Sequence, residues 1–239
     1  MAEECTQLTI VIPALNEAQR IRPTLEEYAG HFQALYGQRF EILVVLNGCT
    51  DDTRSVVEEE TERFRQIRFI EFVQPLGKGG ALWEGFQASK GEILAFADAD
   101  NMVKASETEK LIQSLDNYDI ATGNRFSGDQ ENRGQPFGRW LASRSLNTWV
   151  RLFLRVQLQD TQCGAKALRS SAWERLAPLI EEKGWAFDLD LLSTANRLGL
   201  KVVDIPVEWE HIEEGSKLRP LTDGPKAIIA TFRIKFRNR

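Results

Sequence analysis

The stretch ILAFADADNMV, residues 93–103, joins an apolar run directly to two aspartates that are separated by one alanine. A short apolar run with polar residues at its end is typical of a buried strand. Asp98 and Asp100 are therefore expected at the carboxyl end of that strand, on the same side of the extended chain because they are two residues apart. The two carboxylates are either solvated turn residues or the ligands of something positively charged.

Similar apolar runs alternate with amphipathic segments through the first half of the chain. We expect strands at 8–14, 40–46, 67–73, 92–97 and 118–122, with helices ending near residues 36 and 64 and others over 77–91 and 106–115. In the second half, a polar Gly-rich loop (124–138) precedes helices near 139–155, 171–182 and 187–198, with strand-like segments at 165–169 and 201–209. This alternation predicts an α/β fold with a Rossmann-like, mostly parallel central sheet flanked by helices. The 239 residues suit a single domain.

The cysteines and the N-terminus point to a globular protein of the cytoplasm. No run approaches the roughly 18 apolar residues of a membrane span. The N-terminus lacks the basic region and the cleavage site of a signal peptide. Cys5, Cys49 and Cys163 lie far apart, which favours reduced thiols over a disulfide framework or a zinc site.

Charge is distributed unevenly along the chain, whose net charge is −5. From residue 217 onward a single acid, Asp223, accompanies seven basic residues: Lys217, Arg219, Lys226, Arg233, Lys235, Arg237 and Arg239. Such a segment either meets an anionic surface or is a solvated basic tail.

Polar residues follow each of the first four predicted strands. They read PALNE (13–17), NGCTDD (47–52), GKGG (77–80) and DADN (98–101). In parallel α/β sheets, ligands bind beyond the carboxyl ends of the strands. The four loops therefore predict one ligand site at a common rim of the sheet.

Several longer motifs resemble glycosyltransferase family 2, whose members are inverting enzymes of the GT-A fold. The motifs are VIPALNE, ILVVLNGCTDDT, GKGGALWEGFQASKGEILAFADAD, GNRF, LQDTQCGAKALR, WAFDLDLL and IPVEWEHIEEGSKLRP. They cover nearly the whole chain and are most similar to the dolichyl-phosphate glucosyl- and mannosyltransferases. The resemblance implies one GT-A domain over 1–239, with a nucleotide-sugar-binding half (1–123) and an acceptor-binding half (124–239) that ends in a basic amphipathic segment.

The activity that the resemblance implies is transfer of a hexose from UDP-glucose or GDP-mannose to a polyprenyl phosphate of the dolichyl type. The transfer is a single in-line displacement with inversion. A hard divalent cation, Mg²⁺ or Mn²⁺, would neutralise the diphosphate of the donor. By resemblance, Asp100 is a direct metal ligand and Asp98 lies near the metal or the ribose. Met102 stands where relatives carry a glutamine, so His211 is either the completing ligand or a structural histidine.

The resemblance also assigns residues to the donor. Asn47 replaces an aspartate that contacts the base, which leaves uracil and guanine open as the base. Lys78 is expected to approach a phosphate. The remaining residues expected to line the base and ribose pocket are Pro13, Ala14, Asn16 and Glu17.

A further group of residues is expected at the reacting atoms. Asp188 either orients the acceptor or acts as a base, and Asp190 is its alternative. Basic residues expected to contact phosphates or the sugar are Arg125, Lys217 and Arg219, with Arg133 and Arg139 as weaker candidates.

Three functions remain open at this stage. The first is transfer to a polyprenyl phosphate, with the basic, aromatic segments 137–155 and 224–239 lying peripherally on the cytoplasmic membrane face. The second is transfer to a soluble hydroxyl acceptor, with Asp188 as base. The third is a non-catalytic nucleotide-sugar-binding module. A nucleic-acid partner is not expected.

Overall fold

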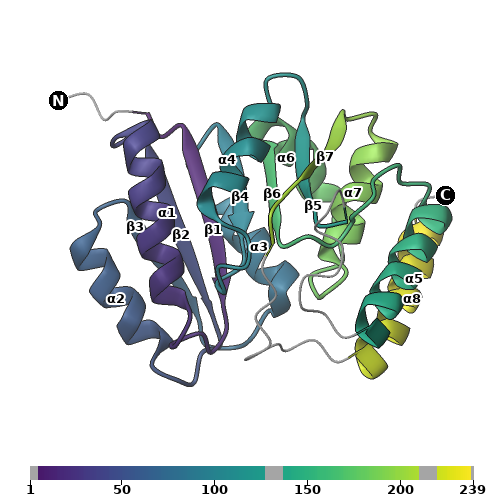
Figure 1. The fold of residues 1–239 in the computed structure, drawn as a ribbon, viewed down its shortest axis with the longest axis horizontal. Coiled ribbons are helices and arrows are strands. Elements are labelled where there is room, and N and C mark those ends of the chain that lie inside the picture. Colours follow the sequence, from purple (N-terminus) through teal and green to yellow (C-terminus); the bar gives the residue numbers. More distant parts are fainter. Residues whose placement is uncertain (1–4, 127–136, 210–219, 238–239) are drawn as a thin grey trace.

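A twisted seven-stranded sheet forms the centre of the molecule, in the order β3-β2-β1-β4-β6-β5-β7, with helices on both faces (Figure 1). The structure is a computed structural model that describes residues 5–126, 137–209 and 220–237. The strands are β1 (Leu8–Ala14), β2 (Phe40–Asn47), β3 (Ile67–Phe72), β4 (Ile93–Ala97), β5 (Ile120–Asn124), β6 (Ala165–Arg169) and β7 (Val202–Pro206).

Helices pack against each face of the sheet and create two cores. One core lies under α1 (Ile21–Tyr36), α2 (Thr53–Arg63) and α4 (Ala105–Ser114). The other lies under α3 (Gly77–Gln87), α5 (Phe137–Leu154), α6 (Ser170–Leu176), α7 (Phe187–Arg197) and α8 (Pro220–Arg237). Because both faces are covered, β2 is buried along its whole length, which explains the apolar run from Ile42 to Leu46.

The predicted elements are present, and the α/β fold with a mostly parallel sheet is confirmed. The strand expected at 118–122 lies at 120–124, a shift of two residues. The helix expected near 171–182 is shorter, because α6 ends at Leu176 and a 3₁₀ turn (Ala177–Leu179) follows. Pro178 lies in that turn, and a proline lacks the N–H group that an α-helix needs to continue.

Strand β6 is antiparallel to both of its neighbours, β4 and β5. Its first residue, Ala165, pairs with Ala97 at the carboxyl end of β4, and Lys166 pairs with Phe96. The start of β6 therefore lies beside the loop that carries Asp98 and Asp100. The sequence pattern did not predict this insertion, because the direction of a short strand leaves no trace in its own residues.

Candidate nucleotide-sugar site

The loop after β4 carries Asp98 and Asp100 and is held in place by α1. Thr24 Oγ1 donates a hydrogen bond to the carbonyl of Ala99 (2.9 Å), and the Tyr28 hydroxyl donates to the carbonyl of Val103 (2.9 Å). Thr24 and Tyr28 are buried, so these bonds are shielded from water. The two aspartates are therefore presented on a rigid support at the rim of the sheet.

The carboxylates of Asp98 and Asp100 are close enough to repel one another. Burial, and then the charge of Asp98, raises the pKa of Asp100 above its ordinary value. The backbone N–H of Met102 donates to Asp100 Oδ1 (3.2 Å), so Met102 supports the loop through its main chain. Two neighbouring carboxylates supply the oxygen ligands that a hard divalent cation prefers.

Gly164, just before β6, provides the surface against which Asp98 packs. A Cβ atom added to Gly164 would lie 1.9 Å from Asp98 Oδ2, which is far closer than any real contact. The residue at 164 must therefore lack a side chain for Asp98 to occupy its position. The sequence motif contained this glycine, but its role depends on the antiparallel insertion of β6.

Lys166 brings a buried positive charge to the same place. Its side chain is 0% exposed, and its Nζ lies 2.7 Å from Asp188 Oδ1 and donates to the carbonyl of Cys163 (2.8 Å). The ammonium also lies over the ring of Phe96, 5.3 Å from its centroid. Asp188 is buried in the first turn of α7, where the helix dipole favours a negative charge. Lys166 and Asp188 thus form one buried ion pair beside the rim.

Asp190, the alternative to Asp188, faces the other side of α7. It is fully buried, and its Oδ2 accepts hydrogen bonds from the backbone N–H groups of Glu181 and Glu182 (3.0 Å each). Its Oδ1 pairs with Arg237 of α8 at 2.5 Å. Asp190 therefore ties α7 to its neighbours, and Asp188 is the carboxylate that faces the rim.

The loops after β1 and β2 are tied together. Asn16 has a positive φ of 52° and exchanges hydrogen bonds with Thr50, accepting from its N–H at 2.8 Å. The backbone N–H of Glu17 donates to Thr53 Oγ1 (2.7 Å). Pro13 and Ala14 end β1 directly beneath this contact. The four residues expected to line the base and ribose pocket therefore lie together at one end of the rim.

Asn47 has a role that differs from the expected contact with the base. Its Oδ1 accepts a hydrogen bond from the N–H of Leu76 (2.7 Å), and its Nδ2 donates to the carbonyl of Gly77 (3.2 Å). The residue is 3% exposed. Asn47 therefore holds the turn that starts α3, since both polar atoms of its side chain bind the backbone there, and its contact with the base stays a prediction.

The glycines around Lys78 serve to pack α3 against the segment that leads into α7. The N–H groups of Gly79 and Gly80 donate to the carbonyls of Gly184 (3.2 Å) and Lys183 (2.5 Å). A Cβ on Gly79 would lie 2.4 Å from the Cβ of Phe187. The amides of Gly79 and Gly80 are thus already bonded, and the side chain of Lys78 lies at the rim, 2.5 Å from Asp98.

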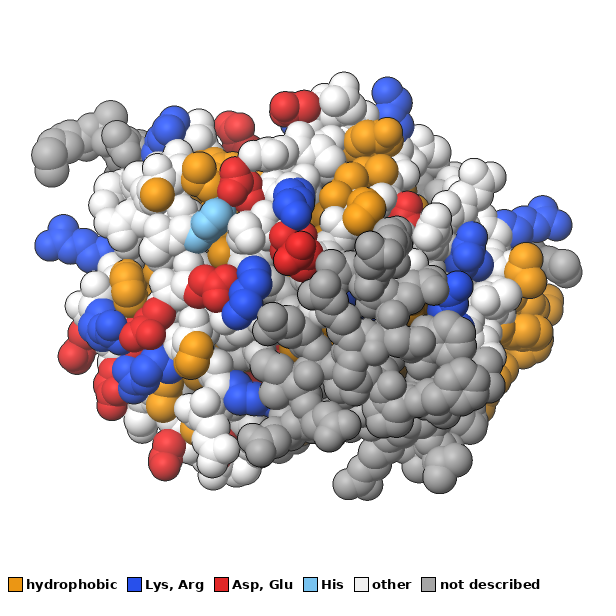
Figure 2. Space-filling model, viewed as in Figure 1, with side chains coloured by type: hydrophobic (Ala, Val, Ile, Leu, Met, Phe, Trp, Pro, Cys, Tyr) orange, Lys and Arg blue, Asp and Glu red, His pale blue; other side chains and the backbone are white. Residues whose placement is uncertain are grey.

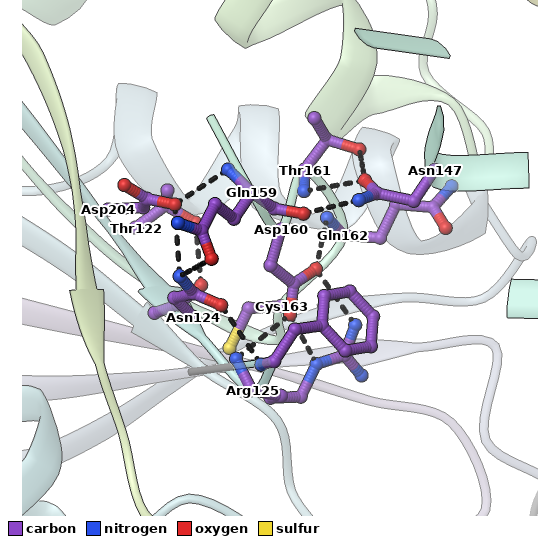
Figure 3. Close-up of polar contacts among 12 residues, drawn as sticks. Thr122, Asn124, Arg125, Asn147, Gln159, Asp160, Thr161, Gln162, Cys163 and Asp204 are labelled. Atoms are coloured by element: carbon purple, nitrogen blue, oxygen red, sulfur yellow. Dashed lines mark hydrogen bonds and ion pairs between the residues drawn. The ribbon is translucent and has the colours of Figure 1, made fainter. Parts of the chain in front are cut away.

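Arg125 lies at the end of β5 in a polar network that includes Asp160 (Figure 3). Its Nε and Nη2 pair with the two carboxylate oxygens of Asp160 at 2.7 and 3.0 Å. Burial would lower the pKa of Arg125, but the charge of Asp160 outweighs burial and raises it. Burial would raise the pKa of Asp160, and Arg125 reverses that effect and lowers it. Asp160, to which the sequence analysis assigned no role, therefore fixes the orientation of Arg125.

Four of the expected residues, Arg133, His211, Lys217 and Arg219, lie outside the described residues, as does the side chain of Arg139. Within the described ranges, no group of three His, Cys, Asp or Glu residues forms a metal cluster. Trp209, however, forms an antiparallel bridge with Val103. The chain that leads to His211 therefore passes beside the loop of Asp98 and Asp100.

An apolar surface lies on the other side of the molecule from α1 and α2, along α5 and α8, which run side by side (Figures 1 and 2). Its exposed large side chains are Trp149, Leu152, Ile228, Ile229, Phe232 and Phe236, and we call them the α5–α8 surface. Phe153 and Phe232 pack at 4.7 Å between ring centroids and join the two helices. None of the described helices is long and apolar enough to cross a membrane.

The architecture has a close counterpart among solved structures. Glucosyl-3-phosphoglycerate synthase from Mycobacterium tuberculosis, crystallised with Mn²⁺, UDP-glucose and phosphoglyceric acid, superposes with a TM-score of 0.70. The match covers 96% of this chain and 79% of that one, at 24% sequence identity. This similarity shows that the chain has the GT-A fold.

Residues 9–176 match the model of the family described as glycosyl transferase family 2, and the chain belongs to that family. It is 32% identical over 240 residues to a dolichyl-phosphate beta-glucosyltransferase of Saccharomyces cerevisiae, covering 92% of this chain and 71% of the relative. It is also 35% identical over 207 residues to the glycosyltransferase AglD of Haloferax volcanii, and this match covers 85% of the present chain. The chain spans 33% of AglD's length.

Proposed function

We propose that the protein transfers glucose from UDP-glucose to a polyprenyl phosphate of the dolichyl type. The cluster of Asp98, Asp100 and Lys78 at the rim carries this proposal, because it combines oxygen ligands with a cation for a diphosphate. The similarity to dolichyl-phosphate glucosyltransferases supports both the sugar and the acceptor. GDP-mannose is the alternative donor, since no contact among the described residues distinguishes uracil from guanine.

Mg²⁺ or Mn²⁺ fits the residues present at the rim. Asp98 and Asp100 supply hard oxygen ligands, and burial together with the neighbouring charge of Asp98 raises the pKa of Asp100. We assign His211 as the third protein ligand, because Trp209 is bridged to Val103 in the same loop. When bound there, the cation would neutralise charge on the departing diphosphate.

The first half of the chain, 1–123, is proposed to bind the donor, and the second half, 124–239, the acceptor. Pro13, Ala14, Asn16 and Glu17 would surround the base and ribose. Lys78 would contact the diphosphate, and Arg125 is oriented by Asp160 toward the rim. Lys217 would pair with a phosphate of the donor or the acceptor.

The proposed reaction is an in-line displacement at C1 of the sugar. A phosphate oxygen of the acceptor forms the new bond to C1, and the bond between C1 and the donor's β-phosphate oxygen breaks with its electron pair. UDP leaves, and the configuration at C1 is inverted. An anionic acceptor needs no base, which suits an Asp188 that is already paired with Lys166. The chain's contribution is orientation and charge.

Transfer to a soluble hydroxyl is the second candidate function, and it requires Asp188 to take the proton of the acceptor. The two candidates predict different effects of Asp188→Asn. A hydroxyl acceptor makes this variant inactive at unchanged donor binding, whereas a phosphate acceptor leaves measurable transfer.

Transfer of radiolabel from UDP-glucose to a polyprenyl phosphate tests the proposed function. We expect label in the organic extract with Mg²⁺ or Mn²⁺, and loss of that label when EDTA removes the metal. GDP-mannose in a parallel assay tests the sugar. Label only in a water-soluble product would favour the hydroxyl acceptor, and donor binding without turnover on any acceptor would indicate a binding module.

The α5–α8 surface is the proposed contact with the membrane that holds the acceptor. Basic residues lie among its apolar side chains, including Arg233, and anionic lipid attracts each nearby cation by about 1 kcal/mol. The position is peripheral, on the cytoplasmic face.

Leu152→Asp is expected to weaken binding to vesicles that contain anionic lipid by about tenfold, because Leu152 is 76% exposed on this surface. Co-sedimentation with vesicles measures the change. Val73→Asp is the matched control, since Val73 is 90% exposed on the loop after β3. Equal loss of binding in both variants would show that the surface has no special role.

A further inference from the structure

Lys78 and Asp98 form an ion pair at the position where the proposed cation would be held. Lys78 lies in the first turn of α3, and its Nζ is 2.5 Å from Asp98 Oδ1. The ammonium lies 5.8 Å from the centroid of the Phe96 ring. A lysine therefore already neutralises one of the two carboxylates assigned to the metal.

The two lysines beside the Phe96 ring pair with different carboxylates, and Lys78 is the one in contact with Asp98. Lys166, the other lysine in contact with the Phe96 ring, is bound to Asp188. The Lys78 ammonium therefore faces Asp98 at 2.5 Å, whereas the Lys166 ammonium faces Asp188 at 2.7 Å.

An ammonium at hydrogen-bond distance from a carboxylate and a divalent cation on the same carboxylate repel one another. Lys78 can respond to this repulsion, since its charge is at the end of a flexible four-carbon side chain. The side chain is 32% exposed, so it has room to move. Its α3 backbone stays in place, because the amides of Gly79 and Gly80 are bonded to the segment before α7.

We propose that Lys78 is an internal counter-ion that a divalent cation displaces from Asp98, and that the released ammonium then binds the diphosphate of the donor. The inference rests on the proposed metal use at Asp98 and Asp100. It adds a function to Lys78: the lysine makes binding of the metal and binding of the nucleotide depend on one another.

Lys78 is expected to affect metal binding in opposite directions without and with the nucleotide. Without nucleotide, Lys78 competes with the metal and weakens its binding. With nucleotide, the displaced ammonium gains a diphosphate partner, so metal and nucleotide strengthen each other's binding. Such coupling is reciprocal and typically amounts to about tenfold or more.

Titration with Mn²⁺, followed by the electron paramagnetic resonance signal of the free ion, tests the exchange without any measurement of turnover. We expect Lys78→Met and Lys78→Gln to bind Mn²⁺ about tenfold more tightly than the wild type in the absence of nucleotide. In the same variants, UDP should strengthen Mn²⁺ binding by a smaller factor than in the wild type, because only the direct contact between the diphosphate and the metal is left. Two neutral replacements are used so that one still gives a result if the other does not fold. Circular dichroism checks that each variant is folded.

Lys78→Arg keeps the charge and should retain the wild-type pattern. Lys104→Met is the matched control, since Lys104 pairs with Glu27 at 3.4 Å outside the cluster and its loss removes the same charge. Unchanged or weaker Mn²⁺ binding by both neutral variants, with normal binding by the wild type, would overturn the exchange alone. A wild type that binds no Mn²⁺ at all would overturn the proposed metal use together with the exchange.

Discussion

Replacement of Asp100 by asparagine is expected to lower glycosyl transfer about a hundredfold to a thousandfold, the loss typical when one group that stabilises transition-state charge is removed. Asparagine has nearly the same shape but carries no negative charge. The 3.2 Å bond from the N–H of Met102 can persist through the amide oxygen, so the loop should keep its conformation. The loss of charge is then the main change at the site.

Initial rates with saturating donor, together with Mn²⁺ binding, measure this effect. Asp116→Asn is the control, because Asp116 is exposed after α4, away from the rim. We expect Asp100→Asn to lose both transfer and Mn²⁺ binding while keeping the wild-type unfolding midpoint. Transfer within tenfold of the wild type would show that Asp100 is not a metal ligand.

Lys166→Met is expected to lower the free energy of unfolding by about 3–5 kcal/mol, the usual cost of leaving one partner of a buried ion pair uncompensated. Lys166 is fully buried, and Asp188 would be left with a negative charge and no cation at 2.7 Å. Methionine has a similar length and fits among the apolar neighbours of Lys166. The destabilisation therefore reports on charge rather than on volume.

A double-mutant cycle separates stability from function. Lys166→Met combined with Asp188→Leu removes both charges, and stability should return to within about 1 kcal/mol of the wild type. Transfer should stay below the wild-type rate, because the site has lost both groups. Urea unfolding measures the first quantity and the radiolabel assay the second.

Lys110→Met serves as the comparison for this cycle. Lys110 pairs with Glu107 at 2.7 Å but is 50% exposed, so its loss should cost less than about 1 kcal/mol. If Lys166→Met also lowers the free energy of unfolding by less than about 1 kcal/mol, the ion pair of Lys166 and Asp188 does not stabilise the site. Recovery of transfer in the double variant would remove Asp188 from the proposed machinery.

Much of the rim could be predicted from local sequence. Asp98 and Asp100 follow an apolar run, and Asn16 and Glu17 follow another, so their place at strand ends required no knowledge of the fold. Asn47 shows what this reasoning leaves out. It ends β2, and its side chain turns to the backbone of Leu76 and Gly77, a contact that no pattern in the sequence predicts.

The sequence by itself determined the alternation of strands and helices, the mostly parallel sheet and the gathering of polar loops at one rim. Each of these depends on the spacing of apolar residues, which is a local property. Only the tertiary structure decided that Gly164 supports Asp98, that Lys166 neutralises Asp188 and that Asp160 orients Arg125. These partners come from different elements, and the antiparallel insertion of β6 between β4 and β5 brings the first two pairs together. Strand order and direction follow from packing of the whole chain, so no short stretch of residues encodes them.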